Sequence, residues 1–221
     1  MNTFDTTAPI AAVIDVPAGR VQVIAAERAN ATVEVRPADA GKGRDVKAAE
    51  QTTVEFRDGV LHIQAAPARH QILGPSGSVE LTVQLPAGSK VTAKAAAAEF
   101  RAVGRLGDVA FDGAHGAIKV DEAASLKLTA HGGDVVVGRL TGPAEISTAQ
   151  GDIRIAEAAA GTVVLTTQAG NIEIGAARGV SATLDAGTTL GRIRNSLKND
   201  GAAELNIRAT TIQGDITARS L

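Results

Sequence analysis

A short motif that recurs along the second half of the chain constrains its fold more than any other feature. The motif is a glycine, then Asp or Asn, then two apolar residues separated by one residue. It occurs as Gly133-Asp134-Val135-Val136-Val137, Gly151-Asp152-Ile153-Arg154-Ile155, Gly170-Asn171-Ile172-Glu173-Ile174 and Gly214-Asp215-Ile216, with degraded copies at residues 116–120 and 191–195. Gly followed by Asp or Asn favours a turn, and apolar residues two apart favour a strand with one buried face. Each copy therefore predicts a turn that leads into a strand.

Aligned on this motif, the copies form columns of apolar residues. The first column is Phe100, Ile118, Val135, Ile153, Ile172, Ile193 and Ile216. The second is Ala93, Phe111, Leu128, Ile146, Leu165, Leu184 and Ile207, seven residues before the first until two-residue insertions widen the offset to nine in the last two copies. A third, Val109, Leu126, Ala144, Val163, Ala182 and Leu205, lies two residues before the second. No copy could bury its apolar face alone, so successive copies are expected to stack.

These columns predict an all-β fold, a right-handed parallel β-solenoid of about seven coils over residues 91–221. Residues 94–100 have a helix-forming composition but keep the seven-residue offset, so we expect a strand there. Residues 1–90 lack the period and contain alternating strands, including a hairpin that turns at Asp58-Gly59. Residues 37–50 are expected to be a polar loop or a short helix. We interpret residues 1–90 as an N-terminal β-sheet that caps the first coil.

Composition excludes several classes of protein. The chain has no cysteine, so it has neither disulfides nor thiol chemistry nor Cys-ligated metal. Its net charge of −2 argues against nucleic acid as a partner. The apolar runs are shorter than a membrane span, and residues 1–16 do not have the pattern of a signal peptide. We therefore expect a cytoplasmic protein that does not bind a membrane.

The repeats also support a resemblance. Leu85-Pro86-Ala87-Gly88-Ser89 follows an alternating strand, repeats the earlier Val16-Pro17-Ala18-Gly19, and precedes the Gly-Asp-Ile-x-Ile units. In this order the chain resembles the β-strand-repeat family of unknown function that is often labelled adhesin. The resemblance covers essentially the whole chain and implies the fold. It implies no activity and no catalytic residues, although the label itself implies export.

Two groups of residues could bind a metal ion. Asp134, Asp152 and Asn171 occupy equivalent turns, where a ladder of oxygen atoms could hold a cation such as Ca²⁺. Gly-Asp and Gly-Asn also form turns without a ligand, and we favour that interpretation. His115 and His131 lie one copy apart, but at different offsets from their columns, which favours ordinary surface histidines. We therefore expect no metal and no cofactor.

Carboxylate pairs raise the alternative of polysaccharide chemistry. Asp121 with Glu122, or Asp108 with Asp112, could be nominated, but nothing in the sequence singles out one acid with a raised pKa. No aromatic residue follows Phe111, so the second half has no ring on which a sugar could stack. We predict a non-enzymatic interaction or scaffold protein with no catalytic residues. The alternative is a polysaccharide-binding or polysaccharide-cleaving solenoid.

Two segments are candidates for binding a partner. The first is a loop in which large aliphatic residues lie between basic residues and a Gly-Pro-Ser-Gly turn; its candidate residues are Arg69, His70, Ile72, Leu73 and Ser76. We favour the simpler interpretation, in which the loop is a hairpin connection that packs onto the sheet. The second is the last copy, residues 203–217, whose unpaired strands suggest a homodimer through the C-terminal coils. The alternative is a monomer with an exposed but polar tip. We also expect outward-facing Arg154, Glu173 and Arg194 to stack as a ladder of alternating charge.

Overall fold

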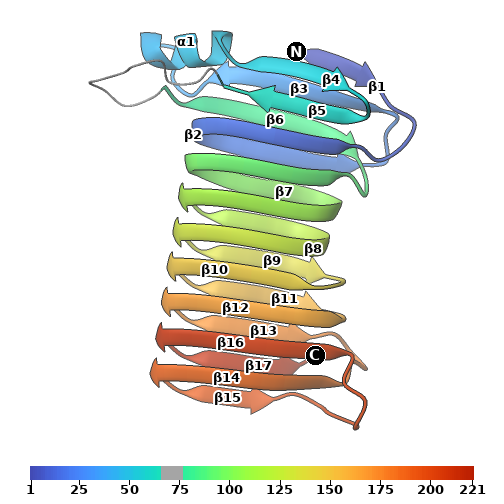
Figure 1. Cartoon of the computed structure of the whole chain (residues 1–221), viewed down its shortest axis with the longest axis vertical. Coiled ribbons are helices and arrows are strands. Elements are labelled where there is room, and N and C mark those ends of the chain that lie inside the picture. The colour runs from blue at the N-terminus through green and yellow to red at the C-terminus, as the bar shows by residue number, and fades with distance from the viewer. Residues whose placement is uncertain (66–76) are drawn as a thin grey trace.

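The computed structural model describes residues 1–65 and 77–221, which form a tall stack of strands in two layers (Figure 1). Within these ranges there are seventeen strands and one helix. The elements are β1 (Asn2–Asp5), β2 (Ala11–Ala26), β3 (Asn30–Pro37), α1 (Gly43–Glu50), β4 (Thr53–Arg57), β5 (Val60–Gln64), β6 (Val79–Pro86), β7 (Lys90–His115), β8 (Ile118–Gly132), β9 (Val135–Leu140), β10 (Ala144–Gln150), β11 (Ile153–Ala158), β12 (Gly161–Ala169), β13 (Ile172–Ala176), β14 (Ala182–Leu190), β15 (Ile193–Ser196), β16 (Leu205–Gln213) and β17 (Ile216–Ser220).

Parallel pairing of equivalent strands builds most of the stack. In one layer the register partners are, in order, Phe100, Ile118, Val135, Ile153 and Ile172. In the other layer they are Phe111, Leu128, Ile146 and Leu165. All of these side chains are buried, so both predicted columns are confirmed up to this point. The chain is all-β and solenoid-like.

Strand alternation decides which side chains form the core. Residues 94–100 lie within β7, the strand that the seven-residue offset predicted, and they pair in parallel with β2. Lys94 is exposed, whereas Ala95, Ala98 and Phe100 are buried. Packing of the apolar face thus outweighs the helical preference of the alanine run.

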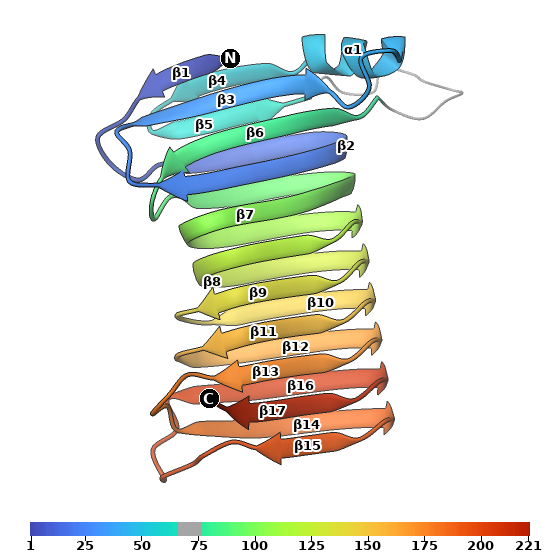
Figure 2. The ribbon, with the colours of Figure 1, turned by 180° about the vertical axis from the view of Figure 1, so that it is seen from behind.

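The N-terminal strands form one end of the molecule, which Figure 2 shows from behind. Here β1 pairs with β3, β3 with β6, and β4 with β5, all antiparallel. The predicted hairpin is confirmed, with Asp58 at φ 52° and Gly59 at φ 75° in its turn. Helix α1 lies where a polar loop or short helix was expected, and its buried Asp45 accepts a hydrogen bond from the Ser78 N–H at 2.9 Å. By contrast, β2 pairs in parallel with β7 and so extends the stack.

The order of the strands at the C-terminal end differs from the predicted order. Strand β16 pairs with β12 on one side and with β14 on the other, and β17 likewise lies between β13 and β15. Residues 205–220 are therefore inserted between two segments that precede them in sequence (Figures 1 and 2). The expectation that residues 203–217 end the stack is wrong. The end is formed by β14 and β15.

Side-chain polarity explains this order. Ala218 lies beside Ile174 and is fully buried, while Asn195 is the next residue in the same column and is exposed. If β15 lay directly on β13 with β17 outside it, the Asn195 amide would be enclosed between two apolar layers. A buried amide without partners is costly. The observed order leaves Asn195 at the open end, where its Oδ1 accepts a hydrogen bond from the Leu197 N–H at 3.0 Å.

Two details of register also differ from the prediction. Leu165 lies beside Ala209, which lies beside Ala186, so the seven-residue offset persists and no insertions occur. The bulkier Leu184 and Ile207 belong to the third column. In the charge ladder, Arg154 and Glu173 are neighbours with Nε–Oε2 at 3.1 Å, as predicted. Arg194 does not neighbour Glu173, because Thr217 lies between them.

Candidate functional site

The repeated Gly-Asp motif forms one corner of the stack. Gly151 has φ +134°, and a Cβ there would lie 2.3 Å from the carbonyl oxygen of Gly133. Glycine is therefore required for both conformation and close approach. The following side chain bonds to the next layer: Asp134 Oδ1 accepts from the Asp152 N–H at 2.9 Å, and Asp152 Oδ1 accepts from the Asn171 N–H at 2.8 Å.

The same bonds continue in the spatial order of the layers. Asn171 Oδ1 accepts from the Asp215 N–H, and Asp215 Oδ1 accepts from the Arg192 N–H, each at 2.9 Å. These contacts correspond to the turn-forming interpretation of Asp134, Asp152 and Asn171. In residues 1–65 and 77–221, no group of three or more His, Asp or Glu residues is placed to hold a metal ion. His115 has Gly132 as its register partner, so His131 is one residue out of register with it.

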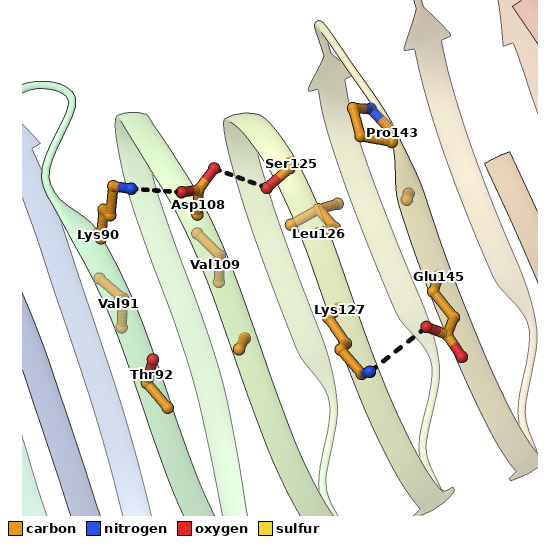
Figure 3. A pocket seen from close by; sticks show the side chains of 12 residues that line it. Lys90, Val91, Thr92, Asp108, Val109, Ser125, Leu126, Lys127, Pro143 and Glu145 are labelled. Carbon is orange, nitrogen blue, oxygen red and sulfur yellow. Dashed lines mark hydrogen bonds and ion pairs between the residues drawn. The ribbon is translucent and has the colours of Figure 1, made fainter. Parts of the chain in front are cut away.

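A shallow groove of about 500 Å³ crosses the outer face of β7, β8 and β10 (Figure 3). Lys90 Nζ lies 2.8 Å from Asp108 Oδ2, and Ser125 Oγ donates a hydrogen bond to Asp108 Oδ1 at 2.8 Å. Farther along the groove, Lys127 Nζ lies 3.5 Å from Glu145 Oε2. The charged side chains that line this groove are thus paired with one another.

The electrostatics of the groove do not suit a general acid. The hydrogen bond from Lys90, followed by that from Ser125, lowers the pKa of the Asp108 carboxyl, and Asp108 raises the pKa of Lys90. A general acid needs a raised pKa. Asp112 is four residues farther along the same strand, about 13 Å away, beyond the ~5–9.5 Å that separates the carboxyls of glycosidases. The nominated pair Asp108 and Asp112 therefore lacks both the electrostatics and the spacing.

The other nominated pair is Asp121 with Glu122. Asp121 Oδ2 accepts a hydrogen bond from the Gly104 N–H at 3.3 Å, which joins neighbouring layers. Glu122 has Arg105 and Arg139 as register partners, and these arginines form ion pairs with Glu27 and Glu157.

The open end of the stack is the strongest candidate for an interaction site. Among the described residues, β14 pairs only with β16, and β15 pairs only with β17. At the start of β14, the Leu205 N–H donates to the Ser181 carbonyl at 3.2 Å, whereas the Ala182 N–H donates to Lys198 and not to β16. Backbone groups alternate along a strand, so those of Thr183, Asp185 and Gly187 face β16. Those of Leu184, Ala186 and Thr188 point away from the stack.

Apolar side chains accompany this edge. Leu190 is 65% exposed and Ile193 is 46% exposed, and Ile212, 54% exposed, lies one layer inward. The column partner of Ile193, Ile216, is completely buried. The edge thus offers both backbone hydrogen-bonding groups and apolar surface.

Comparison with known proteins identifies the family. A family model described as Toastrack DUF4097 matches residues 12–220. The chain belongs to the Toastrack family. No curated protein matches it in sequence.

Solved structures also resemble this Toastrack chain. One is a "putative cell adhesion protein" from Clostridium sporogenes, with 7% identity, a TM-score of 0.46, and coverage of 100% of this chain and 98% of that one. A "putative adhesin" from Bacteroides fragilis has 9% identity, a TM-score of 0.42, and coverage of 98% and 95%. A "putative lipid binding protein" from Parabacteroides distasonis has 11% identity, a TM-score of 0.45, and coverage of 98% and 95%.

Sequence reasoning did not find the open end of this Toastrack chain, because it assumed that the copies stack in sequence order. The signal that could have revealed the end is Asn195, a polar residue in an inward-facing position. The nominated loop residues Arg69, His70, Ile72, Leu73 and Ser76 lie outside the described residues. Where the structure is described, no helix is long and apolar enough to span a membrane.

Proposed function

We propose that this Toastrack chain is a non-enzymatic interaction or scaffold protein that docks a partner strand on its open end. The observation that carries the proposal is the edge formed by β14 and β15, where each strand pairs on one side only among the described residues. An exposed edge is a template for a further strand. The exposed Leu190 and Ile193 add apolar surface that a partner would cover.

The proposal includes the handedness of the solenoid, its number of coils and its N-terminal cap. A right-handed solenoid of about seven coils, with residues 1–90 as its cap, has one protected end and one open end. Strands β5 and β6 pair in parallel with β2, and each has an antiparallel partner, β4 and β3, so these pairs support the cap by covering the N-terminal side of the stack. A scaffold of this kind would accept its partner at the β14 and β15 end.

The chemistry of the outer face favours this function over polysaccharide binding or cleavage. Phe4 packs against Phe56 with ring centroids 5.5 Å apart, and Phe100 packs against Phe111 at 4.9 Å. These are the only aromatic rings in the chain, and none lines the groove of Figure 3. The groove therefore lacks a platform on which a sugar ring could stack.

A peptide probe tests the edge directly. A fluorescein-labelled peptide with the sequence of residues 182–190 supplies a strand, and a scrambled peptide of the same composition is the control. We expect saturable binding in fluorescence anisotropy, abolished by Ala186→Pro and retained by Gly187→Ala. The Ala186 N–H points away from β16, so proline there removes no hydrogen bond between β14 and β16, and Gly187 has open space around it.

Two outcomes would overturn the proposed function. The first is absence of peptide binding at protein concentrations up to about 1 mM, the weak limit of a specific interaction. The second is turnover of a polysaccharide, or a melting temperature raised by members of a glycan panel, since a ligand of the native state stabilises it.

A further inference from the structure

The open end has the features of a surface that pairs with itself. Resting on the proposed function, we infer that its partner is a second copy of this chain. The two stacks would meet end to end about a twofold axis that passes through both layers. In this arrangement β14 pairs antiparallel with β14 of the partner subunit, and β15 with its equivalent. Both sheets then continue from one subunit into the other.

The backbone of β14 defines the register. Its outward-pointing groups belong to Leu184, Ala186 and Thr188, because the bond from the Leu205 N–H to the Ser181 carbonyl places the odd-numbered residues toward β16. If the axis passes at Ala186, that residue lies opposite its equivalent in the partner subunit, and the two exchange both backbone hydrogen bonds. Leu184 and the partner subunit's Thr188 pair in the same way. All three outward-pointing residues are then used, and Asp185 faces the partner subunit's Gly187 as a non-hydrogen-bonded pair.

Side chains are compatible with this register. The carboxylate of Asp185 would face a glycine of the other subunit, so like charges do not meet across the axis. Leu184 would lie opposite the partner subunit's Thr188, and both residues are half-buried in the isolated chain. Exposed large apolar residues also concentrate near this end. Of Met1, Val13, Leu190, Ile193, Ile212 and Leu221, three belong to β14, β15 or the adjacent β16.

The area of the open end is sufficient for a reversible dimer. The nine residues of β14 span about 30 Å at ~3.3 Å per residue, and two layers ~10 Å apart with their side chains are roughly 20 Å thick. Such a face is about 600 Å² per subunit, or about 1,200 Å² in total, the lower limit for a specific interface. We expect dissociation in the micromolar range, and a doubled rod with an N-terminal sheet at each outer end.

Sedimentation velocity of the full chain tests the inference. Concentrations from 1 to 100 µM bracket a micromolar dissociation constant. Wild type and Gly187→Ala should reach twice the monomer mass of 22.3 kDa, whereas Ala186→Pro should stay monomeric because it lacks the N–H that donates to Ala186 of the partner subunit. A monomeric wild type at 100 µM overturns the inference, and so does a dimer that persists in Ala186→Pro. If the wild type is monomeric but binds the peptide, the second copy is excluded while the docking function stands.

Crosslinking keeps the register testable even if Ala186→Pro does not fold. The chain has no native cysteine, so a single substitution reports one contact. Ala186→Cys lies on the axis and should form an intersubunit disulfide under mild oxidation, because hydrogen-bonded partners have Cα atoms about 5.5 Å apart, within disulfide reach. Thr183→Cys should not, because its partner across the axis is Thr189. Crosslinking through Thr183→Cys and not Ala186→Cys would overturn the register.

Discussion

Alanine substitutions of two isoleucines in the same column, made one at a time, show which of the two segments lies inside the stack. Ile216 is completely buried between Ile172 and Ile193, whereas Ile193 is 46% exposed at the open end. Ile216→Ala removes three buried carbon groups, worth about 2.4 kcal/mol at ~0.8 kcal/mol each. A residual cavity raises the expected loss to about 3–5 kcal/mol.

Ile193→Ala should cost much less. Nearly half of that side chain is already in water, so the transfer contribution falls to about 1.2 kcal/mol, and no closed cavity can form beside solvent. Urea midpoints followed by circular dichroism, with the slope checked for each variant, give the two free energies of unfolding. If the copies stacked in sequence order, Ile193 would be internal and Ile216 terminal. Equal losses, or the reverse ranking, would therefore refute the reasoning.

The corner and the groove allow three smaller tests. Gly151→Ala should destabilise by about 1–3 kcal/mol through backbone strain, whereas Gly187→Ala should stay within about 0.5 kcal/mol, as thermal unfolding can show. Asp152→Ala removes the carboxylate oxygen that accepts from the Asn171 N–H and should cost about 1 kcal/mol in urea unfolding, most of which Asp152→Asn should restore. Lys90→Gln should raise the pKa of Asp108 toward 3.8 in an NMR titration. Because that pKa is depressed in the folded state, the stabilisation by this pair is present above the unfolded-state pKa and is lost as the pH falls through the folded-state pKa.

Local patterns determined much of the fold in advance. The alternation of apolar residues and the Gly-Asp turns were enough to predict the parallel columns from Phe100 to Ile172, since each step joins copies that are adjacent in sequence and in space. The strand over residues 94–100 could be predicted because its register was compared with that of the other copies. Repetition therefore supplied information that intrinsic propensity lacked.

The order of the last layers could not be derived in this way. It depends on a comparison between two copies, one with Ala218 and the other with Asn195 in the same inward-facing position. Only the stacked arrangement shows that the polar copy belongs at the end. The register error had a related cause, since matching bulky Leu184 and Ile207 to Leu165 disregarded the constant offset that the alanines preserve. The candidate site was missed for the same reason, because it consists of the strands at the end of the stack and their order was predicted incorrectly.

The stack order at the C-terminal end is the central claim, and engineered disulfides test it most directly. The absence of native cysteine gives a clean background. Glu173→Cys with Thr217→Cys joins register partners on neighbouring strands, about 4.8 Å apart and within disulfide reach. Glu173→Cys with Arg194→Cys joins positions two strands apart, about 9.6 Å and beyond that reach. Peptide mass spectrometry after mild oxidation should find the disulfide in the first variant and not in the second. A disulfide between positions 173 and 194, with none between 173 and 217, would contradict the inserted order and the open edge that depends on it.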